Sequence, residues 1–345
     1  MKWILALKSH THFHKDEWNY IYINFYNLFH VYPKKIGDID KDVEALKNSL
    51  TAGGATKVDE NAIIKLLANR NNVMRQQLRN YYNQKYNRDL VHDLKVDLDG
   101  KFETAIVALF DDPFIYDAKS LHKAMLGTGT DTDTCIEIIC TRPNWYLKNI
   151  MTAYTNLTGS DLIKDLKSEV KMMGNTGKLL VSLLNCQRSE NQTPNKETIE
   201  KYADDLIKGG IKRLGTDEKL FMDILTKTST PELQLLMNIY QEKAKESLLV
   251  SIDKEFSGDI KKTLKTIIYA NTTPSEYFAG RVHEAITSGG KKDELLMRIL
   301  ITRDEVDMPR IKECYKKNYG KDMVEAVKEA TLGDYKNLLV ELCDH

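Results

Sequence analysis

The sequence has no long apolar run and little proline, and both shortages restrict the fold. No stretch approaches about 18 consecutive apolar residues, so we expect no segment that spans a bilayer. The apolar run from Trp3 to Leu7 is shorter than the roughly seven to fifteen residues of a secretory signal core. Only 7 prolines interrupt 345 residues, and strand-like alternation of apolar and polar residues is scarce. These absences favour a helical protein that is neither secreted nor membrane-spanning.

Paired cysteines and an excess of charge are also lacking. The 5 cysteines are an odd number, are widely scattered and form no CxxC motif, which is typical of reduced thiols in a cytoplasmic protein. Lys+Arg and Asp+Glu are both 50, and this balance argues against a protein held on nucleic acid by bulk charge. We therefore predict a cytoplasmic protein with no nucleic-acid partner, and leaderless export stays open.

Catalytic signatures are absent as well. The sequence contains no GxSxG, HExxH, P-loop or dinucleotide-binding fingerprint, and no pair of histidines at ligand spacing on a predicted helix. We predict that the chain is not an enzyme.

What the sequence does contain is a fourfold repeat. An apolar-periodic run ends in a tyrosine four times, at Tyr82, Tyr154, Tyr240 and Tyr315, with separations of 72, 86 and 75 residues. An apolar residue follows each tyrosine after eight residues, at Leu90, Leu162, Leu248 and Met323, so the same three intervals recur. Two independent markers that drift in step indicate a true repeat.

Within each repeat the apolar spacing is helical. Ile63, Leu66 and Leu67 fall on one helix face, and Phe221, Ile224 and Leu225 repeat that spacing. A repeat of this length has room for about five short helices. The predicted fold class is all-α. The predicted divisions are an N-terminal tail at 1–37 and repeats 1 to 4 at 38–113, 114–194, 195–274 and 275–345.

A glycine-bearing turn and a distant glutamate recur at one offset in repeats 2 and 3. Glu169 follows Gly129 by 40 residues, and Glu255 follows Gly215 by 40 residues. Glycines allow a tight turn to direct several carbonyls at one point, and Ca²⁺ prefers carbonyl, carboxylate and water oxygens. The predicted ligands are backbone oxygens of Met125, Gly127 and Gly129 with Glu169, and of Gly210, Arg213 and Gly215 with Glu255.

These motifs together resemble the annexin repeat. The resemblance rests on the turn Gly127-Thr-Gly-Thr-Asp131, the helix end Ile139-Cys-Thr-Arg142, a tyrosine-terminated helix and the segment Asp165-Leu-Lys-Ser-Glu169, and it covers roughly residues 38–345. It implies a curved disc of four five-helix repeats. It also implies that calcium held by loops on the convex face bridges the protein to phospholipid head groups.

The four repeats are not equivalent. In repeat 1 the turn around Gly54 lacks the GxGT pattern and its acidic candidate is the shorter Asp97, so these two residues are weaker metal candidates. In repeat 4 the turn carries Lys291 and Lys292, and Ala330 stands where the glutamate should be. We expect no calcium in repeat 4.

The predicted function is calcium-dependent, reversible and peripheral binding to anionic phospholipid membranes. The weakened repeats 1 and 4 leave an alternative, which is a structural or cytoskeleton-associated annexin-like protein with reduced calcium dependence. Residues 1–37 are rich in aromatic side chains, so the tail is a candidate site for a protein partner or for self-association.

Overall fold

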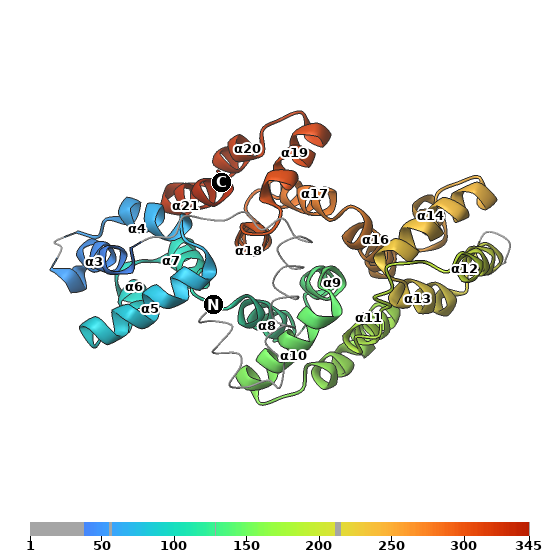
Figure 1. Ribbon diagram of the computed structural model, residues 1–345, viewed down its shortest axis with the longest axis horizontal. Helices are drawn as coiled ribbons and strands as arrows, with labels where there is room; N and C mark the ends of the chain where they lie inside the picture. Colours follow the sequence, from blue (N-terminus) through green and yellow to red (C-terminus); the bar gives the residue numbers. More distant parts are fainter. Residues whose placement is uncertain (1–37, 55–56, 128, 211–214, 345) are drawn as a thin grey trace. The chain divides into compact units, whose positions relative to one another are not determined.

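Every regular element in the described part of the chain is a helix (Figure 1). The structure, a computed structural model, describes residues 38–54, 57–127, 129–210 and 215–344. The all-α prediction is confirmed. The tail at 1–37 lies outside the described residues, and the role predicted for it stays a prediction.

The chain divides into two compact units. Unit 1 contains the described residues up to Pro113 and those from Phe278 onward, and unit 2 contains Phe114–Tyr277. Unit 1 is built from α3 (Ile39–Ser49), the short 3₁₀ helix η1 (Thr51–Gly53), α4 (Glu60–Ala68), α5 (Asn72–Tyr86), α6 (Leu90–Asp97), α7 (Gly100–Ala108), most of α17 (Pro274–Thr287), α18 (Asp293–Arg303), α19 (Met308–Tyr319), α20 (Met323–Ala330) and α21 (Gly333–Cys343). Unit 2 is built from α8 (Pro113–Ala124), α9 (Thr132–Thr141), α10 (Asn144–Thr158), α11 (Leu162–Leu184), α12 (Lys196–Gly209), α13 (Glu218–Lys227), α14 (Thr230–Ala244), α15 (Leu248–Glu255) and α16 (Gly258–Thr272).

Helix α11 is two helices joined at a sharp bend. Gly174 has φ 55°, a left-handed conformation that side chains other than glycine rarely adopt. The other three repeats also place a glycine with positive φ at the junction of their last two helices: Gly100, Gly258 and Gly333. Each repeat therefore reverses the direction of its last helix with a glycine, and in repeats 1 to 3 this turn follows shortly after the acidic candidate.

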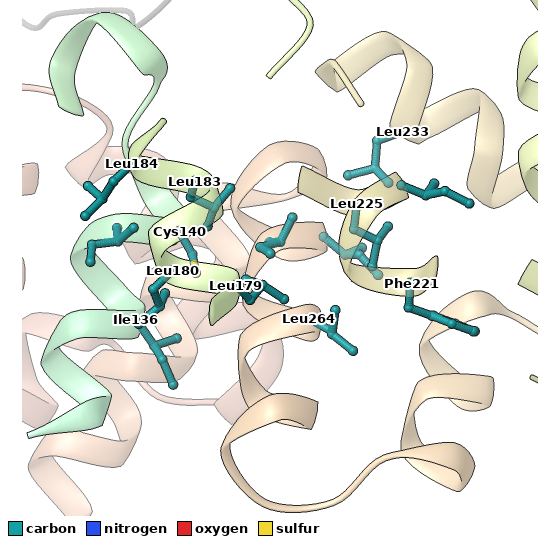
Figure 2. Close-up of a cluster of buried hydrophobic side chains, with 14 of the residues drawn as sticks. Ile136, Cys140, Leu179, Leu180, Leu183, Leu184, Phe221, Leu225, Leu233 and Leu264 are labelled. Carbon is teal, nitrogen blue, oxygen red and sulfur yellow. The ribbon is translucent and has the colours of Figure 1, made fainter. Parts of the chain in front are cut away.

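The apolar stripes of unit 2 meet in one continuous core. The second half of α11 packs against α9 and α13, and α16 packs against α9. Figure 2 shows part of this core, where Leu179, Leu180 and Leu183 of α11 lie among Ile136 of α9 and Leu225 of α13. All five side chains are buried. The core joins repeats 2 and 3 into one unit, which fixes where their loops lie.

The four marker tyrosines are buried and take part in polar contacts. In repeats 1 and 2 the tyrosine hydroxyl donates to an aspartate 11 residues later, from Tyr82 to Asp93 at 2.8 Å and from Tyr154 to Asp165 at 2.9 Å. In repeat 3 the acceptor is the Ser251 hydroxyl at 2.9 Å. A buried phenol needs such a partner, because an unsatisfied hydroxyl in an apolar core is costly.

The buried carboxylate of Asp93 makes the stability of unit 1 depend on acid pH. Arg88 donates to both of its oxygens, at 2.8 and 2.6 Å, and this pairing with a cation lowers the pKa of Asp93 below its usual value. A carboxylate whose pKa is lower in the folded than in the unfolded chain stabilises the fold above its unfolded pKa of about 3.9. That contribution is lost as the pH falls through the folded pKa.

We therefore expect Asp93→Asn to lower the free energy of unfolding by about 1–3 kcal/mol at pH 7, and to lower it by less at pH 3. Urea unfolding of the parent and the variant at both pH values measures the difference. An equal difference at pH 7 and pH 3 would show that the ionised form of Asp93 is not what stabilises the fold.

Candidate functional site

The loop of repeat 2 is closed at both ends by backbone hydrogen bonds. It runs from the end of α8 at Ala124 to Asp131, which caps the first turn of α9 by accepting from the Thr134 amide at 3.1 Å. The Asp131 amide donates to the Ala124 carbonyl at 2.8 Å. Between these anchors Gly127 has φ 103°, a conformation that glycine adopts without strain.

The predicted acidic ligand reaches this loop. The Thr130 hydroxyl, at the end of the loop, donates to Oε2 of Glu169 at 2.5 Å, across 39 residues of sequence. Glu169 is half-buried, and its second carboxylate oxygen accepts no hydrogen bond from the described residues. The loop and the glutamate predicted from sequence are thus brought together, with one carboxylate oxygen available.

Repeat 3 reproduces the arrangement. Its loop is closed by the Asp217 amide, which donates to the Gly209 carbonyl at 2.8 Å, and Gly215 has φ 86°. The Thr216 hydroxyl donates to Oε2 of Glu255 at 2.5 Å, and the other oxygen of Glu255 again accepts nothing from the described residues. Because the same contact between a loop threonine and a distant glutamate occurs in both repeats, it is a feature of the repeat and not an isolated contact.

The predicted backbone ligands lie at matching places in the two loops. Met125 and Gly210 each follow directly the residue whose carbonyl accepts the amide of the capping aspartate. Their own amides donate to Leu121 and Leu206, at 3.2 and 3.0 Å. Gly127, Gly129 and Gly215 are described, whereas Arg213 lies outside the described residues. The ligand role of all these carbonyls stays a prediction.

The two sites of unit 2 lie at the same end of its helices. Lys262, in the second turn of α16, pairs with Asp133 in the first turn of α9. Asn175, next to the bend in α11, donates to Glu218, the first residue of α13. The first contact joins the loop of repeat 2 to the segment that follows Glu255. The second contact joins the loop of repeat 3 to the segment that follows Glu169.

In repeat 1 the acidic candidate is fully occupied. Oδ2 of Asp97 accepts from the Thr51 amide at 2.7 Å, and Oδ1 accepts from the Thr51 hydroxyl. Asp97 thereby caps the short helix η1, which ends before Gly54 at φ 90°. An ion at this place has to share an oxygen that already accepts a hydrogen bond, so Gly54 and Asp97 stay the weaker candidates.

In repeat 4, different residues replace the threonine, the capping aspartate and the glutamate that form the contacts in repeats 2 and 3. In the register that aligns Gly290 with Gly129, Lys291 and Lys292 replace Thr130 and Asp131, and Ala330 replaces the glutamate. Lys292 supplies no side-chain cap to α18 and pairs instead with Glu284. Repeat 4 therefore holds neither the carboxylate nor the threonine that positions it.

The donors present in repeats 2 and 3 fit a hard divalent cation. Carbonyls from a glycine turn, one carboxylate oxygen and water are the ligand types that Ca²⁺ takes. No group of three or more His, Cys, Asp or Glu side chains that could hold a metal occurs among the described residues. A cation held here would need backbone oxygens besides the carboxylate, and that ligand set stays a prediction. None of the helices formed by the residues that the structure describes has both the length and the apolar composition that a bilayer-spanning segment needs.

The threonine contacts were not predicted from the sequence. Thr130 and Thr216 occur in the two repeats that carry the glutamate. In repeat 4 Lys291 stands in place of the threonine and Ala330 in place of the glutamate. This correlation between the threonine and the glutamate within one chain could have indicated from the sequence that the two side chains are in contact. The arginines at the end of the second helix of repeats 2 and 4 have structural roles, because Arg142 pairs with Asp117 and Arg303 pairs with Asp307.

Similarity to known proteins extends over all four repeats. A family model described as Annexin matches residues 41–109, 116–183, 201–267 and 277–342. Annexin A7 of Homo sapiens is 38% identical over 305 residues, which cover 88% of this chain and 62% of that protein. The chain thus spans less than two thirds of the length of this curated relative.

Two solved structures share the fold. The structure of annexin III matches with a TM-score of 0.86 and 33% identity, over 91% of this chain and 96% of that chain. The structure of calcium-bound annexin (Sm)1 matches with a TM-score of 0.81 and 30% identity, over 91% and 93%. The matched repeats, the identity and the shared fold agree, and the chain belongs to the annexin family.

Proposed function

We propose that this chain binds anionic phospholipid membranes reversibly and peripherally in the cytoplasm, through calcium held by the loops of repeats 2 and 3. Annexins are generally calcium-dependent phospholipid-binding proteins rather than enzymes, and one relative of known structure is calcium-bound. The observation that carries the proposal is the repeated contact of a loop threonine with a distant glutamate, Thr130 with Glu169 and Thr216 with Glu255.

Each residue of the arrangement has a distinct task. The loop carbonyls would bind one side of the ion, and the free oxygen of Glu169 or Glu255 would supply its only protein charge. The threonine holds the carboxylate against the loop before any ion arrives, so less conformational freedom is lost on binding. One carboxylate leaves the ion with excess positive charge and open positions, which suits a weak site completed by a lipid phosphate.

The binding of calcium and the binding of lipid are then thermodynamically coupled. If the phosphate binds the ion, calcium tightens lipid binding by the factor by which lipid tightens calcium binding. The two loops lie at one end of unit 2, which allows both to meet the same surface, and the second contact gains from its high effective concentration. The net charge of the chain is zero, so the attraction to an anionic surface has to be local or be supplied by the bound ion, and we propose the ion.

The test is sedimentation with vesicles of phosphatidylserine and phosphatidylcholine across a calcium series. We expect the parent chain to sediment with the vesicles when calcium is present and to be released by chelator, because the ion is the bridge. Vesicles of phosphatidylcholine alone are the control for surface charge. Equal sedimentation in calcium and in chelator contradicts the proposal. Sedimentation with actin filaments in chelator, without vesicle binding, would favour the cytoskeletal alternative.

A further inference from the structure

The most exposed large apolar side chains are not spread evenly over the described residues. Leu332, Val96 and Leu126 are 83%, 67% and 59% exposed. The other large hydrophobic residues classed as exposed reach at most 44%: Ile115, Trp145, Leu157, Val250 and Tyr319. Exposure of this extent at three leucine- or valine-sized side chains opposes the hydrophobic effect, so the positions that they occupy within their repeats are informative.

All three occur next to positions of the calcium arrangement. Leu126 stands between the predicted ligands Met125 and Gly127. Val96 directly precedes Asp97, the acidic candidate of repeat 1. Leu332 follows by two residues Ala330, which occupies the acidic position of repeat 4. Three different repeats thus carry an exposed apolar side chain within two residues of a ligand position.

In unit 1 the contacts place Leu332 beside both loops. A pocket of about 620 Å³ is lined by Leu332 and Ala330 of repeat 4 and by Asp97 of repeat 1, and also by Gly290 of the repeat 4 loop. The Tyr335 hydroxyl donates to the Asp293 carbonyl at 3.2 Å. The side chain of Asp293 pairs with Lys101, which follows the α6–α7 junction. Leu332 therefore lies at the loop end of unit 1.

The side chain of Leu332 does not cap the helix that follows it. Leu332 is the N-cap residue of α21, where Ser, Thr, Asp or Asn would accept from the first amides, and no side-chain cap is made. The same place is held by the polar residues Asp99 in repeat 1 and Ser257 in repeat 3, which make no side-chain cap either. Neither helix capping nor core packing accounts for an apolar side chain here.

We propose that Leu332, Val96 and Leu126 are apolar anchors that enter the boundary between head groups and acyl chains of a phospholipid bilayer. The proposal rests on the proposed function, since Leu126 is flanked in sequence by Met125 and Gly127, two predicted ligands of the ion that would bind the lipid. Repeat 4 lacks a calcium carboxylate, and Leu332 gives that repeat a contact with the bilayer that needs no ion. Single apolar side chains set among polar ones suit a fluid bilayer, whereas a protein partner requires a larger contiguous apolar patch.

Depth of insertion is the direct measurement. Variants L332W, V96W and L126W, each compared with the parent chain, are bound in calcium to phosphatidylserine vesicles that contain phosphatidylcholine brominated in its acyl chains. The parent accounts for the native tryptophans, and L157W, at an exposed leucine of α10 away from the ligand positions, is the matched control. We expect bromine quenching of the tryptophan introduced in each loop variant, and no quenching in L157W beyond that of the parent.

Affinity is the second measurement. If the bilayer buries the side chain of Leu332, L332S should weaken vesicle partitioning at saturating calcium by roughly three- to tenfold. L157S should partition like the parent. Complete sedimentation of L332W without added quenching, together with unchanged partitioning of L332S, overturns the proposal and leaves calcium-dependent binding intact. Failure of the parent to sediment would instead refute the proposed function. A change in self-association of L332S in sedimentation velocity, without a change in partitioning, would assign Leu332 to a contact between copies of the chain and also overturn the proposal.

Discussion

The double variant Glu169→Gln with Glu255→Gln is expected to lose calcium-dependent binding to phosphatidylserine vesicles, or to need on the order of a hundredfold more calcium. Glutamine keeps the size of the side chain and can still accept from Thr130 or Thr216, so the loop contact is preserved. What is removed is the carboxylate charge that each proposed site offers the ion. Each single variant should need on the order of tenfold more calcium, because one loop remains. Vesicle sedimentation across a calcium series gives the midpoints.

The matched control for this experiment is Asp97→Asn in repeat 1. Both oxygens of Asp97 are already engaged by Thr51, so its loss should change the calcium midpoint little. Circular dichroism establishes that each variant retains its helices. A double variant that sediments like the parent at every calcium concentration would show that these glutamates are not the ligands. A large shift in Asp97→Asn would assign the ion to repeat 1 as well.

Much of this arrangement could be predicted because the repeat places equivalent residues in equivalent surroundings. Tyr82 and Tyr154 mark the same buried point of two repeats, and each meets an aspartate at the same distance along the chain. The equal offset from Gly129 to Glu169 and from Gly215 to Glu255 likewise reflects one path through the same helices. A periodic sequence reports such local geometry well.

Contacts between repeats were not predictable in this way. The pairing of Asp133 with Lys262 joins residues of repeats 2 and 3 that share no local pattern, and it depends on how α9 packs against α16. The full engagement of Asp97 by Thr51 depends on η1, a helix too short to leave a periodic signal. The exposure of Leu332 was equally hidden, because an apolar residue beside an apolar helix is normally assigned to the core.

The second large effect is expected in the core of unit 2, where Asp117→Ala should lower the free energy of unfolding by about 3–5 kcal/mol. Asp117 and Arg142 form an ion pair with side chains that are 0% and 5% exposed. The guanidinium donates to both carboxylate oxygens, at 2.8 and 3.2 Å, and lies over the ring of Tyr146. Removal of the carboxylate leaves a buried cation that has lost both its hydration and its ion-pair partner.

Urea unfolding followed by fluorescence measures this effect, because Trp145 of unit 2 packs against Phe114 and reports on that region. A variant that removes both charges, Asp117→Ala with Arg142→Leu, should recover a large part of the loss, since the cost comes from the unpaired cation rather than from the missing bond.

The equivalent pair in unit 1 supplies an internal comparison. Asp42 and Arg70 also form two hydrogen bonds, at 2.7 and 2.8 Å, but their side chains are 10% and 15% exposed. Water reaches the guanidinium of Arg70 more readily, so Asp42→Ala should cost less than Asp117→Ala. Equal losses in the two variants, with no recovery in the double variant, would show that the carboxylate acts by packing and not by neutralising a buried charge.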